Sequence, residues 1–137
     1  SKINLLNFLS IFISIMVCFL TRVKIADNCG VREAQCIKLL GGALPKRALP
    51  GKMVIVVVKR SDPQKKKLTS GSVSRALVVR TSCSFFRGCG VWLKFGHHAV
   101  VITNKKAAPY GKRLKGPFLK EICISYNFLG TVTRFIV

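Results

Sequence analysis

Acidic residues are scarce in this chain. Its 137 residues include 24 Lys plus Arg but only 4 Asp plus Glu, which gives a formal net charge of +20. The acids are far apart and each has basic neighbours, so no pair of carboxylates is available for acid–base catalysis or for magnesium. They are Asp27, Glu33, Asp62 and Glu121. GxSxG, P-loop and HExxH motifs are missing as well, and we therefore expect no enzymatic activity.

Closely spaced cysteine pairs are also missing. None of the six cysteines belongs to a CxxC motif, and the shortest separation is that between Cys83 and Cys89. Structural zinc sites usually take their ligands in closer pairs. His97 and His98 are adjacent, and adjacent side chains on a strand point to opposite faces. We therefore predict reduced thiols that are buried or half-buried, without a metal or another cofactor.

The excess of positive charge requires a partner. Half of the residues are hydrophobic, so the chain is not a disordered basic tail, and its length suits one domain. A folded chain with this charge repels itself and is stabilised by a polyanion, either a nucleic-acid backbone or an anionic membrane surface. The cations are spread from Arg22 to Arg134 instead of gathering beside an apolar anchor. That distribution favours nucleic acid.

Short β-branched runs follow one another between residues 22 and 103, with Gly, Pro, Ser and Lys between them. They read RVKIAD, AQCIKLL, MVIVVVK, SVSRALVVRT and VWLKF followed by AVVIT. Runs of this length and spacing predict a small antiparallel barrel or sandwich. Later, GPFLKEI places Pro117 at the first position of an expected short helix, with Glu121 one turn on.

Basic residues are densest where this barrel would have its loops. A loop lysine can meet a phosphate as a mobile point charge and an arginine can grip it as a fork. A single basic cluster could be a solvated loop, but four clusters among so few acids favour contact with RNA or DNA. The candidate RNA-binding residues are Arg32, Lys46, Arg47, Lys59, Lys65, Lys66, Lys67, Arg80, Lys105, Lys106, Lys112, Arg113 and Lys115.

Aromatic and turn residues add two further expectations. Trp92, Phe95 and Tyr110 are candidates for stacking on bases, although an aromatic residue on a strand of a small barrel more often belongs to the core. Asp27 and Asn28 are expected to shape the turn that leads to Gly30.

The segment RVKIADNCGVREAQCIKLLGG at residues 22–42 resembles the opening of the fourteenth protein of the large ribosomal subunit, a universal family. That family typically reads L-x-V-A-D-N-S-G-A-R and then C-I-K-V-L-G-G. The resemblance continues in RALVVRT at residues 75–81 and in YGKRLKGPFLKEI at residues 110–122, which is similar to the family's G-T-R-x-x-G-P-x-x-x-E-L. Order and spacing hold over most of the chain from about Met16.

The resemblance implies a mainly β fold, namely a five-stranded β-barrel with basic loop and hairpin extensions and a short C-terminal helix. It implies a structural protein that binds large-subunit rRNA, packs beside ribosomal proteins three and nineteen, and reaches small-subunit rRNA in an intersubunit bridge. In bacterial and organellar members the same face receives the ribosome-silencing factor, and Arg113 is the residue we expect at that interface.

Departures from the family pattern indicate a divergent member. Cys29 replaces the usual Ser, Val31 the usual Ala, and Lys52 a usual Asp, while Cys89 and His98 alter the central signature. Lost acids and gained cysteines indicate a mitochondrial ribosome.

The apolar run INLLNFLSIFISIMVCFL at residues 3–20 could span a membrane, address the chain to a compartment or belong to the fold. The family's initiator aligns with Met16, which divides the chain into an extension of residues 1–15 and one domain of residues 16–137. Fifteen helical residues extend ~22 Å, short of a ~30 Å hydrocarbon core, so we predict no membrane span. With one Lys and no Arg the extension is unlike an arginine-rich presequence, and we expect it to pack on a neighbouring ribosomal protein or RNA groove. The alternatives are a membrane-anchored basic protein and an RNA-binding barrel outside the ribosome.

Overall fold

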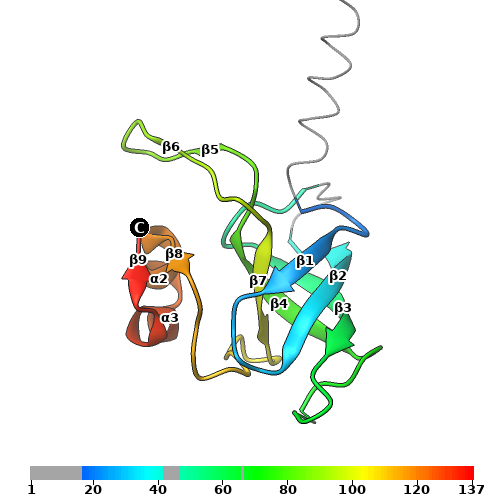
Figure 1. Ribbon diagram of the computed structural model, residues 1–137. Coiled ribbons are helices and arrows are strands. Elements are labelled where there is room, and N and C mark those ends of the chain that lie inside the picture. The colour runs from blue at the N-terminus through cyan, green and yellow to red at the C-terminus, as the bar shows by residue number, and fades with distance from the viewer. Residues whose placement is uncertain (1–16, 42–46, 66) are drawn as a thin grey trace, which may run out of the picture.

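A computed structural model of the chain describes residues 17–41, 47–65 and 67–137. Within these ranges five strands form a closed barrel in the order β1-β2-β3-β4-β7 (Figure 1). They are β1 (Arg22–Ile25), β2 (Val31–Leu39), β3 (Met53–Ser61), β4 (Val73–Arg80) and β7 (Ala99–Thr103). The predicted five-stranded barrel is confirmed.

The expectation of a wholly antiparallel barrel is wrong at one seam. Four pairs of neighbouring strands are antiparallel, but β1 and β7 pair in parallel, with Lys24 opposite Ala99 and Ile25 opposite Val100. The reason is the number of strands. Five strands that alternate in direction leave the first and the last running the same way, so the ladder that closes the barrel has to be parallel.

Valines on alternate positions of β3 fill the barrel. Val54, Val56 and Val58 are at most 1% exposed, whereas Ile55 and Val57 between them are only partly buried. This alternation follows from the pleat of a strand, and each buried valine contributes about 1.5–3 kcal/mol relative to an exposed one. The other buried residues packed with Val54 and Val56 are Val17, Val23, Ala34, Cys36, Ala48, Ala76, Val78 and Val100.

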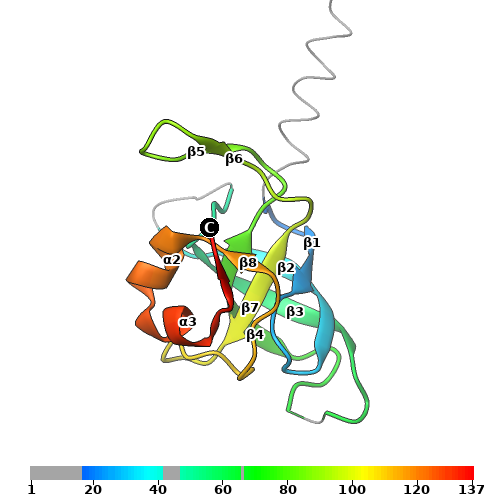
Figure 2. The ribbon, with the colours of Figure 1, turned by 60° about the vertical axis from the view of Figure 1, so that its left-hand side comes forward.

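Strand β7 and the second half of β4 lack this alternation because both of their faces are covered. Leu77 and Val79 of β4, and Val101 of β7, belong to a second core with the C-terminal residues Phe118 and Leu129. The covering segment consists of β8 (Pro117–Phe118), α2 (Lys120–Ser125), α3 (Asn127–Val132) and β9 (Phe135–Ile136), which lie together beside the barrel (Figure 2). A strand covered on both faces reads as a continuous apolar run, as in RALVVRT.

The predicted C-terminal helix is present, but its start was placed three residues too early. Pro117 belongs to β8, which pairs in parallel with β9, and α2 begins at Lys120. The Pro117 carbonyl accepts a hydrogen bond from Arg80 Nη1 (3.0 Å) and the Phe118 carbonyl accepts one from the Val137 N–H (2.8 Å). These long-range partners hold both residues extended. A second short helix, α3, follows after Tyr126.

A two-stranded hairpin, β5 (Phe85–Phe86) and β6 (Trp92–Leu93), extends away from the barrel (Figure 1). Phe86 and Trp92 are 58% and 66% exposed, and their rings meet edge to face with centroids 5.4 Å apart. Phe95, by contrast, is partly buried against the second core. An ion pair of 2.6 Å between Arg87 Nε and Glu121 Oε1 links this hairpin to α2.

All six cysteines lie in the described ranges, and none of them forms a disulfide bond. The prediction of buried or half-buried positions is correct for five of them and wrong for Cys89, which is exposed in the turn of the hairpin. Nowhere in the described part of the chain do three or more His, Cys, Asp or Glu residues gather where they could hold a metal ion.

The apolar N-terminal run falls almost entirely outside the described residues, so the predicted packing of residues 1–15 stays a prediction. Val17, near its end, is fully buried and pairs with Ala48. In the ranges that are described, no helix is long and apolar enough to cross a membrane.

Candidate nucleic-acid interface

The alternating strand directions gather three connections at one end of the barrel. The β1–β2 turn (residues 26–30), the β3–β4 loop (residues 62–72) and the segment after β7 (residues 104–116) all lie at the bottom of Figure 1. We call this the basic end. The β2–β3 connection and the hairpin between β4 and β7 lie at the opposite end, which we call the hairpin end. Three of the four basic clusters seen in the sequence are therefore neighbours in space.

Asn28 holds the three connections of the basic end together. Its carbonyl accepts a hydrogen bond from Lys65 Nζ (3.0 Å), and its side-chain Oδ1 accepts one from the Arg113 N–H (3.1 Å). Asp27 Oδ1 accepts from the Cys29 N–H (3.2 Å), which confirms the predicted turn. The backbone of Asp27 also forms an isolated antiparallel β-bridge with that of Leu114. The basic loops are thus fixed relative to one another before any ligand arrives.

Two glycines allow these connections to approach closely. A Cβ on Gly30, whose φ is +97°, would lie 2.5 Å from Lys65 Cβ. A Cβ on Gly111 would lie 2.8 Å from both Asn28 Oδ1 and Asp27 Cβ. Because neither distance is possible without a shift, glycine is required at both contacts.

Asp27 and Cys29 lie beneath this surface and are 4% exposed each. Burial raises the pKa of Asp27 above its ordinary value, and burial together with the hydrogen bond to Asp27 raises the pKa of Cys29 to about 12. A thiol with so high a pKa stays protonated at neutral pH, so Cys29 is a poor nucleophile. It packs as a small apolar residue.

Two adjoining cavities open at the basic end, and Tyr110 lines both. The larger, of about 400 Å³, is lined by Asn28, Cys29, Lys65, Lys67, Tyr110 and Lys112. The smaller, of about 220 Å³, is lined by Ile55, Val73, Ser74, Arg75, Thr103, Asn104, Lys105 and Tyr110. Five cations and no acid are found among these described lining residues. The cavity walls themselves therefore supply no counter-charge, and the nearest acids of the basic end are Asp27 beneath the surface and Asp62 at the start of the β3–β4 loop.

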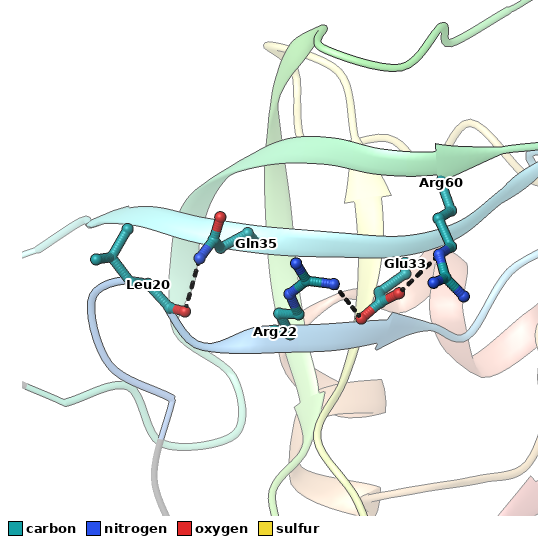
Figure 3. Close-up of polar contacts among 5 residues, drawn as sticks. All are labelled: Leu20, Arg22, Glu33, Gln35 and Arg60. Atoms are coloured by element: carbon teal, nitrogen blue, oxygen red, sulfur yellow. Dashed lines mark hydrogen bonds and ion pairs between the residues drawn. The ribbon is translucent and has the colours of Figure 1, made fainter.

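A second basic surface covers the outside of β1, β2 and β3. Glu33 bridges Arg22 of β1 and Arg60 of β3, at 3.4 and 3.6 Å, and Gln35 Nε2 donates to the Leu20 carbonyl at 3.0 Å (Figure 3). Exposed ion pairs of this kind contribute only ~0–1 kcal/mol, so their main effect is to orient the two guanidiniums. The adjacent cavity, of about 570 Å³, is lined by Arg22, Val23, Lys24, Ile25, Asp27, Val31, Arg32, Glu33, Arg60 and Lys115.

The family of ribosomal protein L14p/L23e matches residues 16–133 of the chain. The chain belongs to this family. The resemblance drawn from the sequence motifs is thereby confirmed, and membership gives the chain a structural role in the large ribosomal subunit. Proteins of this family are ribosomal components and not enzymes, and their partners are rRNA and other ribosomal proteins.

Most of the RNA-binding candidates of this L14p/L23e member are exposed around these surfaces. Lys65, Lys67, Lys105, Lys106, Lys112 and Arg113 lie at the basic end, and Arg32, Lys59 and Lys115 lie on or beside the β1–β3 face. Arg47 is exposed too, but it belongs to the β2–β3 connection at the hairpin end. Lys46 and Lys66 lie outside the described residues.

Arg80 differs from the other candidates because it is only 5% exposed. Its Nη1 donates to the carbonyls of Lys115 (2.9 Å) and Pro117 (3.0 Å), and its guanidinium lies over the Phe118 ring. Burial lowers its pKa. Gly116 leaves room for it, since a Cβ there would lie 2.5 Å from Arg80 Nη1. Arg80 therefore fastens the C-terminal segment to the barrel and is not available to a phosphate in this structure.

Four cations of these surfaces were missing from the sequence candidates. Arg22 and Lys24 could have been found, because they flank the buried Val23 in RVKI and a strand turns alternate residues outward. Arg60 is recognisable only from the β2–β3 register that places it opposite Glu33. Arg75 likewise is recognisable only from the strand register, which places it between Ile55 of β3 and Thr103 of β7.

Proposed function

We propose that this chain binds large-subunit rRNA through its basic end and the adjoining β1–β3 face. The observation that carries the proposal is the pair of cavities around Tyr110, with five cations and no acid among their described lining residues. Lysines at fixed positions on a rigid barrel neutralise phosphates and release counterions, so that binding weakens as salt rises. Recognition of this kind reads RNA mainly through its shape.

The test is sedimentation of the full chain with large subunits after a high-salt wash. The triple variant Lys65→Glu, Lys67→Glu, Lys112→Glu should be lost from the large-subunit fraction at a lower salt concentration than the wild type. The matched control changes the same number of exposed cations away from the basic end, with Lys94→Glu, Lys120→Glu and Arg134→Glu. If the two variants are retained equally, the basic end is not part of the rRNA interface. A wild-type chain that binds RNA but stays at the top of the gradient would favour a barrel outside the ribosome.

The proposal extends to an intersubunit bridge with small-subunit rRNA, for which Arg113 is the strongest candidate. Arg113 is exposed, and its backbone N–H is fixed on Asn28 Oδ1, so the side chain projects from a rigid base. We expect Arg113→Glu to reduce the fraction of large subunits that reassociate with small subunits. Lys94→Glu is the control for the change in charge. If reassociation is unchanged while rRNA binding persists, the bridge is wrong and the rRNA role stands.

We further propose ribosomal proteins three and nineteen as neighbours, and the ribosome-silencing factor as a ligand of the Arg113 face. Exposed apolar residues away from the basic end, among them Trp92, Ile124 and Phe135, support protein contacts there. Cross-linking of intact subunits followed by mass spectrometry tests both neighbours. For the silencing factor, Arg113→Glu should weaken its binding to isolated large subunits.

A mitochondrial ribosome is our proposal for the location of the chain. It is supported by the departures from the family pattern at Cys29, Lys52, Cys89 and His98. Detection of the chain in large subunits purified from mitochondria, and not in those from the cytosol, would support it. The opposite distribution would overturn it without affecting the rRNA-binding proposal.

A further inference from the structure

We propose that the two cavities flanking Tyr110 capture a single unpaired nucleotide of the RNA, with its base against the Tyr110 ring and its phosphates on the surrounding cations. The inference rests on the proposed rRNA binding and adds the kind of RNA element that this site takes. It goes beyond a general attraction to phosphate because it requires an aromatic face and a break in base pairing.

Tyr110 has the exposure and the position that stacking requires. The residue is 37% exposed, and it is shared by the linings of the two cavities. Lys65, Lys67 and Lys112 lie on one side of it, and Arg75 and Lys105 lie on the other. An RNA strand that crosses Tyr110 therefore meets cations before and after the base that contacts the ring.

The backbone that carries Tyr110 is fixed in place. The Tyr110 N–H donates to the Ile102 carbonyl (3.1 Å), and Pro109 pairs with Thr103. Earlier in the same segment, Asn104 Oδ1 accepts hydrogen bonds from the N–H groups of Lys106 (2.9 Å) and Ala108 (3.0 Å). The ring is thus presented by a rigid turn, which lowers the entropy lost on binding.

The cations of the larger cavity are positioned as well. Lys65 Nζ donates one of its three hydrogens to the Asn28 carbonyl, and an ammonium has two more to offer to phosphate oxygens. The loop that carries Lys65 is also held on the β1–β2 turn, because the Asp62 N–H donates a hydrogen bond to the Gly30 carbonyl (2.7 Å). Lys65 is consequently held at the rim of the cavity in the absence of RNA.

An unpaired base suits this site better than a duplex. A cavity of about 400 Å³ is within the range of small-ligand pockets, ~300–1,000 Å³. A paired base remains inside its stack and offers no face to a side chain, whereas an unstacked base can lie on an aromatic ring. Since every base has such a face, we expect the site to prefer an unpaired nucleotide with little dependence on which base it is.

The exposed aromatic pair of the hairpin does not form a comparable site. Phe86 and Trp92 lie on the hairpin, and the sequence from residue 81 to residue 94 contains two cations, Arg87 and Lys94. Arg87 is paired with Glu121 through two hydrogen bonds of 2.6 and 3.0 Å, and Lys94 is exposed. Trp92 is therefore a control, being an exposed aromatic residue with one exposed cation close to it in the sequence instead of the five cations that line the cavities around Tyr110.

The experiment compares two RNA hairpins that each contain one 2-aminopurine. In the first hairpin the 2-aminopurine is a bulged, unpaired nucleotide, and in the second it is part of a base pair. Wild-type full-length protein should bind the bulged hairpin about tenfold more tightly, with a change in 2-aminopurine fluorescence that the paired hairpin does not show. Tyr110→Leu should abolish the preference, whereas Tyr110→Phe and Trp92→Leu should keep it. Lys65→Ala, Lys67→Ala and Lys112→Ala combined should weaken binding to both hairpins.

The outcomes separate this inference from the proposed function. If wild-type protein shows no preference, or if Tyr110→Leu retains it, the nucleotide site is wrong. If in the same experiment the triple lysine variant still weakens binding to both hairpins, the rRNA-binding proposal stands alone. If the triple variant binds both hairpins like the wild type, the proposed function fails at this surface. The fluorescence of the wild-type complex tests the site even where Tyr110→Leu is unstable.

Discussion

The two ends of the barrel differ in what holds them and in what they expose. At the basic end, hydrogen bonds centred on Asn28 and close glycine contacts fix three charged connections. At the hairpin end, exposed aromatic rings and one arginine–carboxylate pair sit above a C-terminal segment packed on the barrel through Phe118 and its neighbours.

The two ends of the barrel therefore support different properties of the protein, namely RNA binding at the basic end and stability at the hairpin end. Polar backbone contacts position side chains without covering them, so the lysines of the basic end remain accessible to phosphate. Apolar packing stabilises by removing surface from water, and it supplies most of the adhesion between the C-terminal segment and the barrel. Changes at the hairpin end and beneath it should therefore affect stability first, and changes at the basic end should affect RNA binding first.

The largest effect on stability is expected from Phe118→Ala. Phe118 is fully buried between the barrel and the C-terminal segment and lies under the Arg80 guanidinium. Removing such a ring costs about 3–5 kcal/mol of unfolding free energy, which urea denaturation measures. Phe86→Ala, at an exposed ring, is the control and should cost far less. Similar losses for the two variants would contradict the packing described for the C-terminal segment.

Gly111→Ala should cost less, about 1–3 kcal/mol. The added Cβ would lie 2.8 Å from Asn28 Oδ1 and would push apart the connections that meet there. Denaturation measures the loss, and RNA affinity should fall with it because the lysines move. Gly88→Ala in the hairpin, where a Cβ would meet nothing within 4 Å, is the matched control. No loss of affinity in a destabilised Gly111→Ala would show that the position of these loops is unimportant for binding.

A smaller and pH-dependent effect is expected from Asp27→Asn. Burial raises the pKa of Asp27 above its ordinary 3.8, and its Oδ2 has no hydrogen-bond partner within the described residues. The folded state therefore holds this proton more tightly than the unfolded state. Its contribution to stability is complete below pH 3.8 and is lost as pH rises through the raised pKa. Urea denaturation across this range should show a fall in the wild type that Asp27→Asn lacks. If the unfolding free energies of wild type and variant change with pH in parallel, the raised pKa of Asp27 is contradicted.

The smallest effect on stability is expected from Glu121→Gln at the hairpin end. The contribution of Glu121 is lost as pH falls, whereas that of Asp27 is lost as pH rises. The hydrogen bonds from Arg87 lower the pKa of Glu121 below its ordinary 4.5. The stabilisation is present above pH 4.5 and is lost as pH falls through the lowered pKa. Because Glu121 is largely exposed, solvent weakens the pair. Melting temperatures of wild type and variant should thus differ slightly at neutral pH and converge in acid. A constant difference would mean that the charge of Glu121 does not matter.

Local patterns predicted the parts of the fold that depend on local chemistry. The alternation in MVIVVVK, the β-branched runs that form β1, β2, β3, β4 and β7, and the turn at Asp27 lie where expected, because each depends on neighbours along the chain, whereas VWLKF contributes to the hairpin and not to the barrel. The features that the sequence did not predict depend on contacts between residues far apart in the chain. Pro117 is extended because Arg80 and β9 hold it there, and the same contact buries Arg80, which the sequence presents as one more cation.

The sequence predicted many of the lysines of the candidate interface, but it missed Arg22, Lys24, Arg60 and Arg75 and did not predict how the cations are arranged. Lys65, Lys67, Lys105 and Lys112 were identified from charge alone. Their assembly around Tyr110 depends on strand direction, which places three connections at one end and leaves Arg47 at the other. No spacing in the sequence encodes the fact that Asn28 joins Lys65 to Arg113 across the barrel.

The most direct test of this account is lysine footprinting of the chain in purified large subunits, by acetylation and mass spectrometry, before and after ribonuclease treatment. We expect Lys65, Lys67, Lys105 and Lys112 to be protected in intact subunits and to become reactive once the RNA is removed. Lys94 and Lys120, exposed away from the basic end, should show no such dependence on RNA. The account is contradicted if those two lysines carry the ribonuclease-sensitive protection while the lysines of the basic end react freely in the intact subunit.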